Sequence, residues 1–194
     1  MNTNETVRIE SFKNIFRRTI ENKIVWVLSF TFLTAIASQF AIPVKPVPFT
    51  LQTIAVLLAG AVLGAKRGAL SQLIYLALGI TGLPVFAQTP DGALGFARLL
   101  GPTGGYLLAF PIAAYLTGRL IEINKSYITV VSSMFFGSIV IIFFGTIYLH
   151  LLFLNDFAQA VKAGAAVFTI WTVVKVFAAT AIYFGITKRN SDKS

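Results

Sequence analysis

The sequence predicts an all-α, polytopic membrane protein with six transmembrane helices and with both termini in the cytoplasm. Three observations support this prediction. Of the 194 residues, 56% are hydrophobic and only 12% are charged, about half the charged share of an ordinary soluble domain. Apolar segments long enough for a bundle of membrane helices recur along the chain. The basic residues are distributed unevenly between the loops, as the positive-inside rule expects.

The composition also excludes several classes of protein. The many aliphatic and aromatic residues exclude a disordered chain. A net charge of +9 could indicate nucleic-acid binding, but so apolar a chain offers no basic surface interleaved with aromatic residues, and no nucleic-acid partner is expected. Cysteine is absent, which excludes a disulfide framework, a thiol nucleophile and a cysteine metal site.

The chain divides into three parts. Residues 1–23 carry basic and apolar residues at helical spacing and are expected to form an amphipathic segment on the cytoplasmic face. Residues 24–187 are expected to form the membrane domain, and residues 188–194 a cytoplasmic tail. The six predicted spans lie at about 24–42, 50–64, 68–81, 104–120, 127–152 and 164–187.

With the N-terminus inside, this arrangement places 12 basic residues on the cytoplasmic side and 4 elsewhere. The cytoplasmic set is Arg8, Lys13, Arg17, Arg18, Lys23, Lys66, Arg67, Arg119, Lys125, Lys188, Arg189 and Lys193. The other set is Lys45, Arg98, Lys162 and Lys175. The asymmetry supports this orientation, with both termini inside; the resemblance described below implies the plasma membrane of a prokaryotic cell.

The unusual sequence lies in the outer loops. Loop 43–50 holds three of the seven prolines, and loop 82–103 is long, rich in Gly and Pro, and still apolar. A loop of this length in a compact protein is usually a lid or a binding loop. The inner loops are short; the second and third spans are separated only by residues 65–67, which predicts a tight hairpin. The working face is therefore expected to point outward.

Lys175 stands near the middle of the last predicted span. An unpaired ammonium in hydrocarbon costs several kcal/mol, so it either faces a ligand or pairs with a backbone carbonyl. Thr172 lies one turn away on the same face and could bind the same ligand. Arg98, in the outer loop just before Gly104-Gly105, either meets a carboxylate or lies at the headgroup level. Asp91 is placed in a turn, where a structural role is favoured.

Buried amides also require hydrogen-bond partners, which either a ligand or another helix could provide. Gln52, at the start of the second span, either bonds another helix or a ligand, and Gln72, Tyr75 and Gln88 are comparable. The single histidine, His150, cannot build a metal site, so a polar interfacial role is expected.

An enzyme is not favoured. Asp91-Gly92 and Ala97-Arg98 are similar to the opening of membrane CDP-alcohol phosphotransferases, but their gap is too long and no acidic pair follows. No P-loop and no GxSG motif occur, so the chain is expected to bind rather than to catalyse.

Three stretches are similar to the signatures of one family: IPVKPVPFTLQT (42–53), GAKRGALSQLIYLALGITGLPVFA (64–87) and GPTGGYLLAFPIAAYLTG (101–118). On these motifs the chain resembles BioY, the biotin-binding S components of energy-coupling factor (ECF) transporters, from about residue 24 to 178. The resemblance implies a six-helix protein that binds biotin from outside. It also implies partnership with a transmembrane coupling subunit and two cytoplasmic ATPases, which alone use ATP, and no cofactor in the S component itself.

The resemblance also implies site residues. In S components, small residues of the first helix form the docking surface for the coupling subunit, which here would be Thr31, Ala35 and Ser38. The carboxylate of biotin would be held by Lys175 and Arg98. Its bicyclic end would pack among apolar and aromatic side chains, and further polar contacts would come from amides and a hydroxyl. The side chains around the bicycle would be Tyr106, Phe96 and Trp171. The amides would be those of Gln88 and Gln52, and the hydroxyl that of Thr172.

The last motif departs from the family pattern. The family lysine is kept as Lys175, but Thr172 stands at the aspartate position and Trp171 at the glycine position. Two rival hypotheses therefore stay open: an S component for another small carboxylic acid or vitamin, and a membrane enzyme that uses Asp91, Arg98 and His150.

Overall fold

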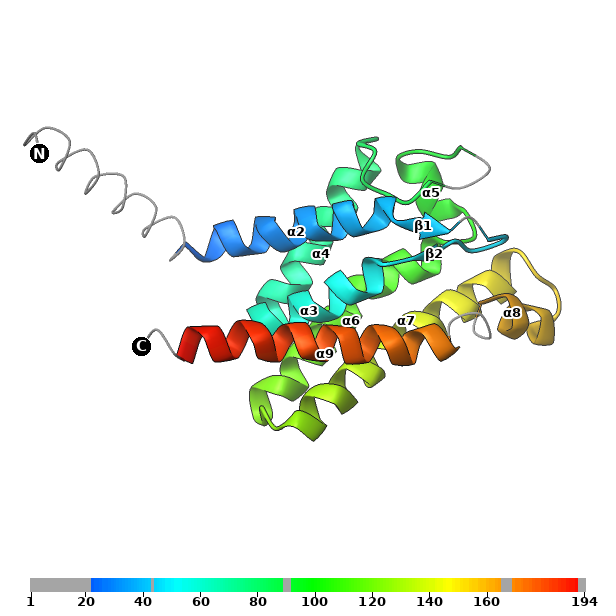
Figure 1. Ribbon diagram of the computed structural model, residues 1–194. Coiled ribbons are helices and arrows are strands. Elements are labelled where there is room, and N and C mark those ends of the chain that lie inside the picture. Colours follow the sequence, from blue (N-terminus) through cyan, green and yellow to red (C-terminus); the bar gives the residue numbers. More distant parts are fainter. Residues whose placement is uncertain (1–21, 43, 89–91, 165–168, 192–194) are drawn as a thin grey trace, which may run out of the picture.

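The computed structural model describes residues 22–42, 44–88, 92–164 and 169–191, and the predicted helical class is confirmed (Figure 1). Six longer helices make up the bundle, and two short helices and one hairpin lie at one of its ends. The longer helices are α2 (Lys23–Gln39), α3 (Gln52–Leu63), α4 (Ala65–Ile80), α6 (Gly104–Ile123), α7 (Tyr127–Leu152) and α9 (Thr169–Ser191). The short elements are α5 (Phe96–Leu100), α8 (Phe157–Gly164), β1 (Ala41–Ile42) and β2 (Phe49–Thr50).

The helix α7 has the predicted bounds 127–152, α6 differs from its predicted span at one end, and the other four differ at both ends. The first helix stops at Gln39 because residues 41–42 pair antiparallel with 49–50, with Ala41 opposite Thr50. In the predicted span 164–187, Gly164 belongs to α8 and residues 169–187 belong to α9, whereas residues 165–168 lie outside the described residues. The predicted segment 1–23 falls outside the described residues except for residues 22 and 23. Of the predicted tail 188–194, residues 188–191 continue α9, and 192–194 lie outside the described residues.

The turn between α3 and α4 is shorter than predicted. Gly64 alone makes it, with φ of +81°, a left-handed conformation that side chains other than that of glycine rarely adopt. The carboxylate of Glu122 accepts a hydrogen bond of 2.9 Å from Ala65 N and so caps α4. Lys66 and Arg67 therefore lie in the first turn of α4, not in a loop.

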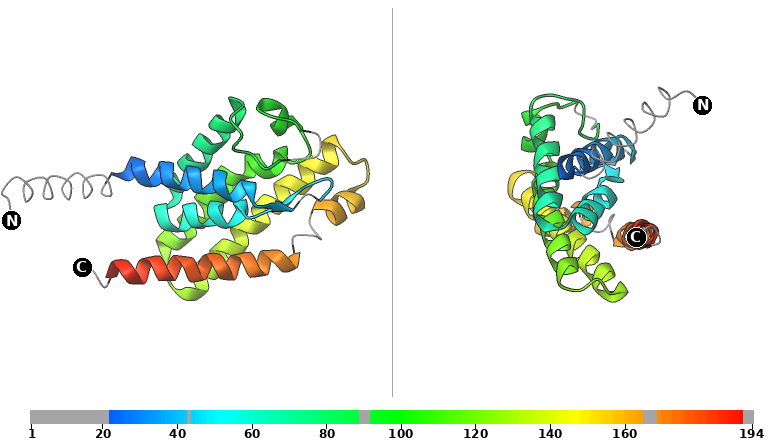
Figure 2. Two further views of the ribbon diagram at one scale, coloured as in Figure 1. Left: turned by 45° about the horizontal axis from the view of Figure 1, so that its top comes forward. Right: turned by 90° about the vertical axis from the view of Figure 1, so that its left-hand side faces the viewer.

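The core is built around α3 and α6. Glycines let the backbones approach closely: a Cβ at Gly60 would lie 3.1 Å from Cα of Ala114 in α6, and one at Gly68 would lie 2.7 Å from Cα of Gly60. Seen end-on, α9 lies on the outer side of α3, away from α4 (Figure 2). The start of α2 and the end of α9 lie at the same end of the bundle, and the hairpin lies at the other end (Figure 1).

Two described helices, α6 and α7, are long and apolar enough by themselves to cross a membrane. The helix α3 is also apolar but has only 12 residues, a length of about 18 Å against a hydrocarbon core of about 30 Å. In a membrane, non-helical backbone next to so short a helix would be tolerated only where it lines a cavity or is buried in protein. Phe49 and Thr50 of the hairpin that precedes α3 are indeed buried.

Candidate functional site

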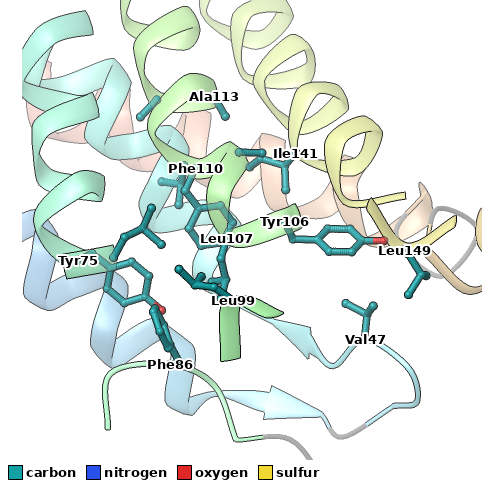
Figure 3. Packing of buried hydrophobic residues seen from close by; sticks show 14 of the residues in the cluster. Val47, Tyr75, Phe86, Leu99, Tyr106, Leu107, Phe110, Ala113, Ile141 and Leu149 are labelled. Atoms are coloured by element: carbon teal, nitrogen blue, oxygen red, sulfur yellow. The ribbon is translucent and has the colours of Figure 1, made fainter. Parts of the chain in front are cut away.

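The hairpin end of the bundle contains two adjoining cavities. The first, of about 40 Å³, lies between the hairpin, the segment before α5, and helices α5, α6 and α7; the second, of about 10 Å³, reaches α9. Both are lined by Thr53, Tyr106 and Ile141, which stand between them. We call the two cavities together the pocket. Figure 3 shows Tyr106 from α6 and Ile141 from α7 beside each other, with Val47 on the hairpin loop.

Lys175 lies at the α9 side of the pocket and is only 5% exposed. Its Nζ donates a hydrogen bond of 2.6 Å to the carbonyl of Thr50, and it lies 3.8 Å from the ring centroid of Phe49. The ammonium thus joins α9 to the second strand of the hairpin. A cation over an aromatic face is stabilised by the ring quadrupole, which helps to retain the charge in an apolar setting.

Arg98 lies on the opposite side of the pocket and is 3% exposed. The five-residue helix α5 buries Arg98 and Leu99 and leaves its other side chains at the surface. The guanidinium donates to the carbonyl of Ala87, which also lines the pocket. Two buried cations therefore stand on either side of one apolar pocket, each bonded to a backbone carbonyl. A carboxylate is a stronger acceptor for such groups than a carbonyl is.

Gln52 lies at the pocket and is held by a chain of hydrogen bonds. Its amide nitrogen donates to the hydroxyl of Tyr75 at 2.5 Å, and its oxygen accepts from the hydroxyl of Thr50 at 3.0 Å. The Tyr75 hydroxyl in turn donates to the carbonyl of Val85 at 3.1 Å. This chain links the hairpin, α3 and α4 to the segment before α5, so Gln52 positions the pocket wall.

We expect Gln52→Leu to destabilise the protein by about 1–3 kcal/mol, because the buried Thr50 hydroxyl loses its acceptor and Tyr75 loses a donor. The measurement is the thermal midpoint in detergent, with Gln159→Leu, at an exposed amide on α8, as the matched control. Equal midpoints for the two variants would contradict the role of the chain.

Two further polar atoms belong to residues that line the pocket. The hydroxyl of Thr53 is buried and has no hydrogen-bond partner among the residues that the structure describes. Pro111, inside α6, has no N–H, so the carbonyl of Leu107 does not receive the usual helical hydrogen bond. Leu107 lines the first cavity. A donor and acceptor at Thr53 and an acceptor at Leu107 are therefore candidates for binding a polar ligand group.

Of the other predicted site residues, Tyr106 and Thr172 line the pocket, and three do not. Phe96 is 58% exposed, because α5 turns its Arg98 face inward and its Phe96 face outward. Trp171 is 52% exposed; its ring packs on Phe49 at 5.4 Å and so supports the hairpin from outside. Gln88 is exposed, and it is the neighbouring Ala87 that lines the pocket.

The prediction of a docking surface at Thr31 and Ser38 is also corrected. Both residues are fully buried: the Thr31 hydroxyl donates to the carbonyl of Ser71 at 2.8 Å, and the Ser38 hydroxyl donates to that of Val85 at 2.7 Å. Ala35 packs against the core. The small residues of α2 thus bring α2 close to α4 of the same chain, and the exposed face carries large apolar residues instead: Leu28, Phe32, Leu33 and Ile36.

Several pocket residues were not predicted. They come from the hairpin, the segment before α5 and the α6 and α7 helices: Val47, Pro48, Thr50, Thr53, Phe86, Thr103, Leu107, Phe110, Ile141 and Ser138. Most are ordinary apolar residues, which carry no distinguishing signal in so apolar a chain. Thr50 and Thr53 flank Gln52 in the motif PFTLQT and could have been found by that proximity.

The residues of the enzyme hypothesis are not gathered at one place. His150 Nδ1 is 3.0 Å from the carbonyl of Leu154, at the end of α7, whereas Arg98 lies in the pocket wall. Asp91 lies outside the described residues. Asp156 accepts a hydrogen bond of 2.8 Å from Ala158 N and caps α8. No group of three or more His, Cys, Asp or Glu side chains that could hold a metal ion occurs among the described residues.

A bundle of apolar helices encloses an apolar pocket with two buried cations. This arrangement is that of a membrane protein that binds a small, largely apolar anion. The chain matches the BioY family over residues 8–192, and it therefore belongs to that family, as the motifs predicted.

Relatives and a solved structure agree with this assignment. The chain is 36% identical to the "Biotin transporter BioY" of Thermotoga maritima over 159 residues, 82% of this chain and 92% of that one. It is 40% identical to the "Probable biotin transporter BioY" of Pyrococcus horikoshii over 153 residues, 79% of this chain and 87% of that one. A crystal structure of "the S-component for biotin from an ECF-type ABC transporter" superposes with a TM-score of 0.78, at 26% identity, over 97% of this chain and 95% of that one. The relatives are named as biotin transporters and the solved structure as a transporter S-component, which confirms the prediction that the chain is not an enzyme.

Proposed function

We propose that this chain is the biotin-binding S component of an ECF-type vitamin uptake transporter. The family and its named relatives support this function. The observation in the structure that supports it best is the pair of buried cations, Lys175 and Arg98, on either side of one apolar pocket. Biotin carries a single carboxylate on an apolar chain, and either cation can bind it.

The other end of biotin is a bicycle with a ureido group, which has two N–H donors and one carbonyl acceptor. The apolar lining of Phe86, Leu107 and Phe110 suits the ring carbons. We assign the Thr53 hydroxyl and the Leu107 carbonyl as partners of the ureido group. Tyr106, which lines both cavities, would then lie beside the middle of the ligand.

Binding requires the pocket to widen. Ligand sites usually have volumes of about 300–1,000 Å³, whereas the larger cavity here has about 40 Å³. We expect the hairpin to move when the pocket widens, because it lines the pocket and is held to α9 by side-chain contacts that a ligand could replace. Among these contacts are the Lys175–Thr50 hydrogen bond and the packing of Lys175 and Trp171 on the Phe49 ring. A ligand carboxylate that replaces the Thr50 carbonyl as the acceptor of the Lys175 ammonium would favour that movement.

A titration with biotin tests both the function and the widening. The chain has two tryptophans, so Trp26→Phe leaves Trp171, packed on Phe49, as the single reporter. We expect saturable binding at micromolar biotin or below, accompanied by a change in Trp171 fluorescence. Calorimetry on the unchanged protein provides the control. Absence of binding at micromolar biotin would reject the function, and binding without a fluorescence change would reject the movement of the hairpin.

We also propose the topology and partners. The chain would cross the membrane six times, through α2, α3, α4, α6, α7 and α9, with both termini in the cytoplasm; the uneven distribution of basic residues supports this orientation. It would work with a transmembrane coupling subunit and two ATPase subunits that use ATP, and would need no cofactor of its own. The exposed apolar face of α2, with Phe32 and Ile36, is a better candidate for docking than the buried Thr31 and Ser38.

A second candidate is an S component for another small carboxylic acid. Thr172, which lines the cavity beside Lys175, supports it, because the BioY pattern has an aspartate at this position. Competition of lipoic acid or other small carboxylic acids against biotin distinguishes the two: displacement of biotin by one of them at a lower concentration than biotin itself would favour this candidate.

A further inference from the structure

The end of the bundle opposite the pocket contains a second hollow, between α4 and α6. It has a volume of about 550 Å³ and lies over the tight turn at Gly64. Its polar lining comes from the first turn of α4 and from the last turns of α6: Lys66, Arg67, Tyr115, Arg119 and Glu122. None of these residues takes part in the biotin site.

The hollow has an excess of positive charge, with three cations against one carboxylate. Glu122 is already engaged: its Oε1 accepts from Ala65 N at 2.9 Å and its Oε2 lies 3.6 Å from the guanidinium of Arg119. Among the residues that the structure describes, the side chains of Lys66 and Arg67 have no hydrogen-bond or ion-pair partner. Two cations at one hollow are therefore available to an external anion.

Apolar side chains continue from this hollow toward the middle of the bundle. On α4, Leu70 and Leu73 follow Lys66 at spacings of four and seven residues and are 47% and 53% exposed. On α6, Ile112 precedes Arg119 by seven residues and is 42% exposed. Residues at these spacings share one face of a helix. The cations thus lie at one end of an exposed apolar surface. In a membrane, such a surface faces the acyl chains of lipids.

We propose that this hollow binds the phosphate headgroup of an anionic phospholipid, with its acyl chains along the exposed faces of α4 and α6. Basic pockets between helices at the cytoplasmic surface suit such headgroups, because the inner leaflet is negatively charged. The apolar surface below the cations favours a lipid over an acidic protein segment, which would need no such surface. Only the choice of leaflet depends on the proposed topology; the site itself does not depend on biotin binding.

Native mass spectrometry of the purified protein with added phosphatidylglycerol or phosphatidylcholine tests the proposal. We expect phosphatidylglycerol to bind more tightly, and Lys66→Gln/Arg67→Gln to lower that affinity by about tenfold or more without changing phosphatidylcholine binding. The matched control is Lys125→Gln/Lys188→Gln, which removes two exposed charges from the same end of the bundle and should retain the preference. An equal loss in both double variants would overturn the proposal, because diffuse surface charge would explain the preference.

Two further measurements distinguish other occupants. Inorganic phosphate, added at the same concentration, should not displace phosphatidylglycerol; full displacement would show that the apolar faces contribute nothing and would overturn the lipid proposal. If Lys66→Gln/Arg67→Gln keeps lipid binding but loses association with the coupling subunit, the hollow is a protein interface and the proposal is wrong. Biotin titration of the same variant should be unchanged, which shows that it folds and separates this proposal from the biotin site.

Discussion

Lys175→Met is expected to lower the affinity for biotin by at least about thirtyfold, since loss of one partner of a buried, hydrogen-bonded charge pair costs about 2–5 kcal/mol. Lys175 is 5% exposed and lies in a cavity with Thr53, Tyr106 and Thr172. A carboxylate brought into that setting would lose its hydration without a compensating cation. Methionine keeps the length and apolar stem of the side chain, so that the substitution removes mainly the charge.

Biotin methyl ester, which carries no charge, shows whether the effect acts through the carboxylate. The ester should bind Lys175→Met about as well as it binds the unchanged protein, whereas biotin should not. Lys162→Met, at an exposed position on α8, is the matched control and should leave both affinities unchanged. An unchanged affinity of Lys175→Met for biotin would refute the assigned role. If the variant does not fold, Lys175→Arg, which retains the charge, should retain binding of biotin within a few fold, and loss of binding by it would also count against the role.

Gly60→Ala is expected to destabilise the bundle by about 3 kcal/mol or more, at the upper end of the cost of overpacking a core. The added Cβ would lie 3.0 Å from the backbone carbon and 3.1 Å from the Cα of Ala114, and closer still to its oxygen. On the other side of α3, Gly68 of α4 already approaches Gly60 closely. Since the neighbours on both sides are backbone atoms of helices, no side-chain rotation can relieve the contact.

Gly185→Ala provides the control, because a Cβ at Gly185 in α9 meets no atom within 4 Å. In a helix, alanine is favoured over glycine by about 1 kcal/mol, so this variant should keep or raise the thermal midpoint, whereas Gly60→Ala should lower it or prevent recovery of monodisperse protein. The two changes are chemically identical and are expected to act in opposite directions. Equal midpoints would show that α3 and α6 do not pack as closely as the structure describes.

Local chemistry made part of the site predictable. Lys175, Arg98 and Gln52 are polar residues in apolar surroundings, where the free energy of desolvation demands a partner, and all three are buried at the pocket. The reason for singling them out was independent of the fold. The resemblance to BioY then placed them in one site, which their positions in the sequence, more than 120 residues apart at the extremes, could not do.

Which side chains of a helix point into the bundle was not predictable in the same way. Helical spacing puts Thr31 and Ser38 on one side of their helix, but both sides of α2 are apolar, so the pattern does not say which side meets α4 and which meets lipid. Phe96 and Arg98 were both expected at the ligand; within a helix of only five residues, packing against the rest of the bundle decided that Arg98 turns inward. The same holds for Trp171 and Lys175 on α9.

The sequence by itself determined that the chain is a helical membrane protein of the BioY family, and it singled out Lys175 and Arg98 as cations in apolar surroundings, because hydropathy and motifs are local properties. Only the tertiary structure decided the shape of the pocket, the place of the hairpin in its wall and the cationic hollow at the opposite end. These features arise from contacts between segments far apart in the chain, such as Lys175 with Thr50 and Ala65 with Glu122. In an apolar chain, the local hydropathy pattern is nearly the same whichever face of a helix is buried. Contacts between distant segments therefore determine which face packs inside the bundle.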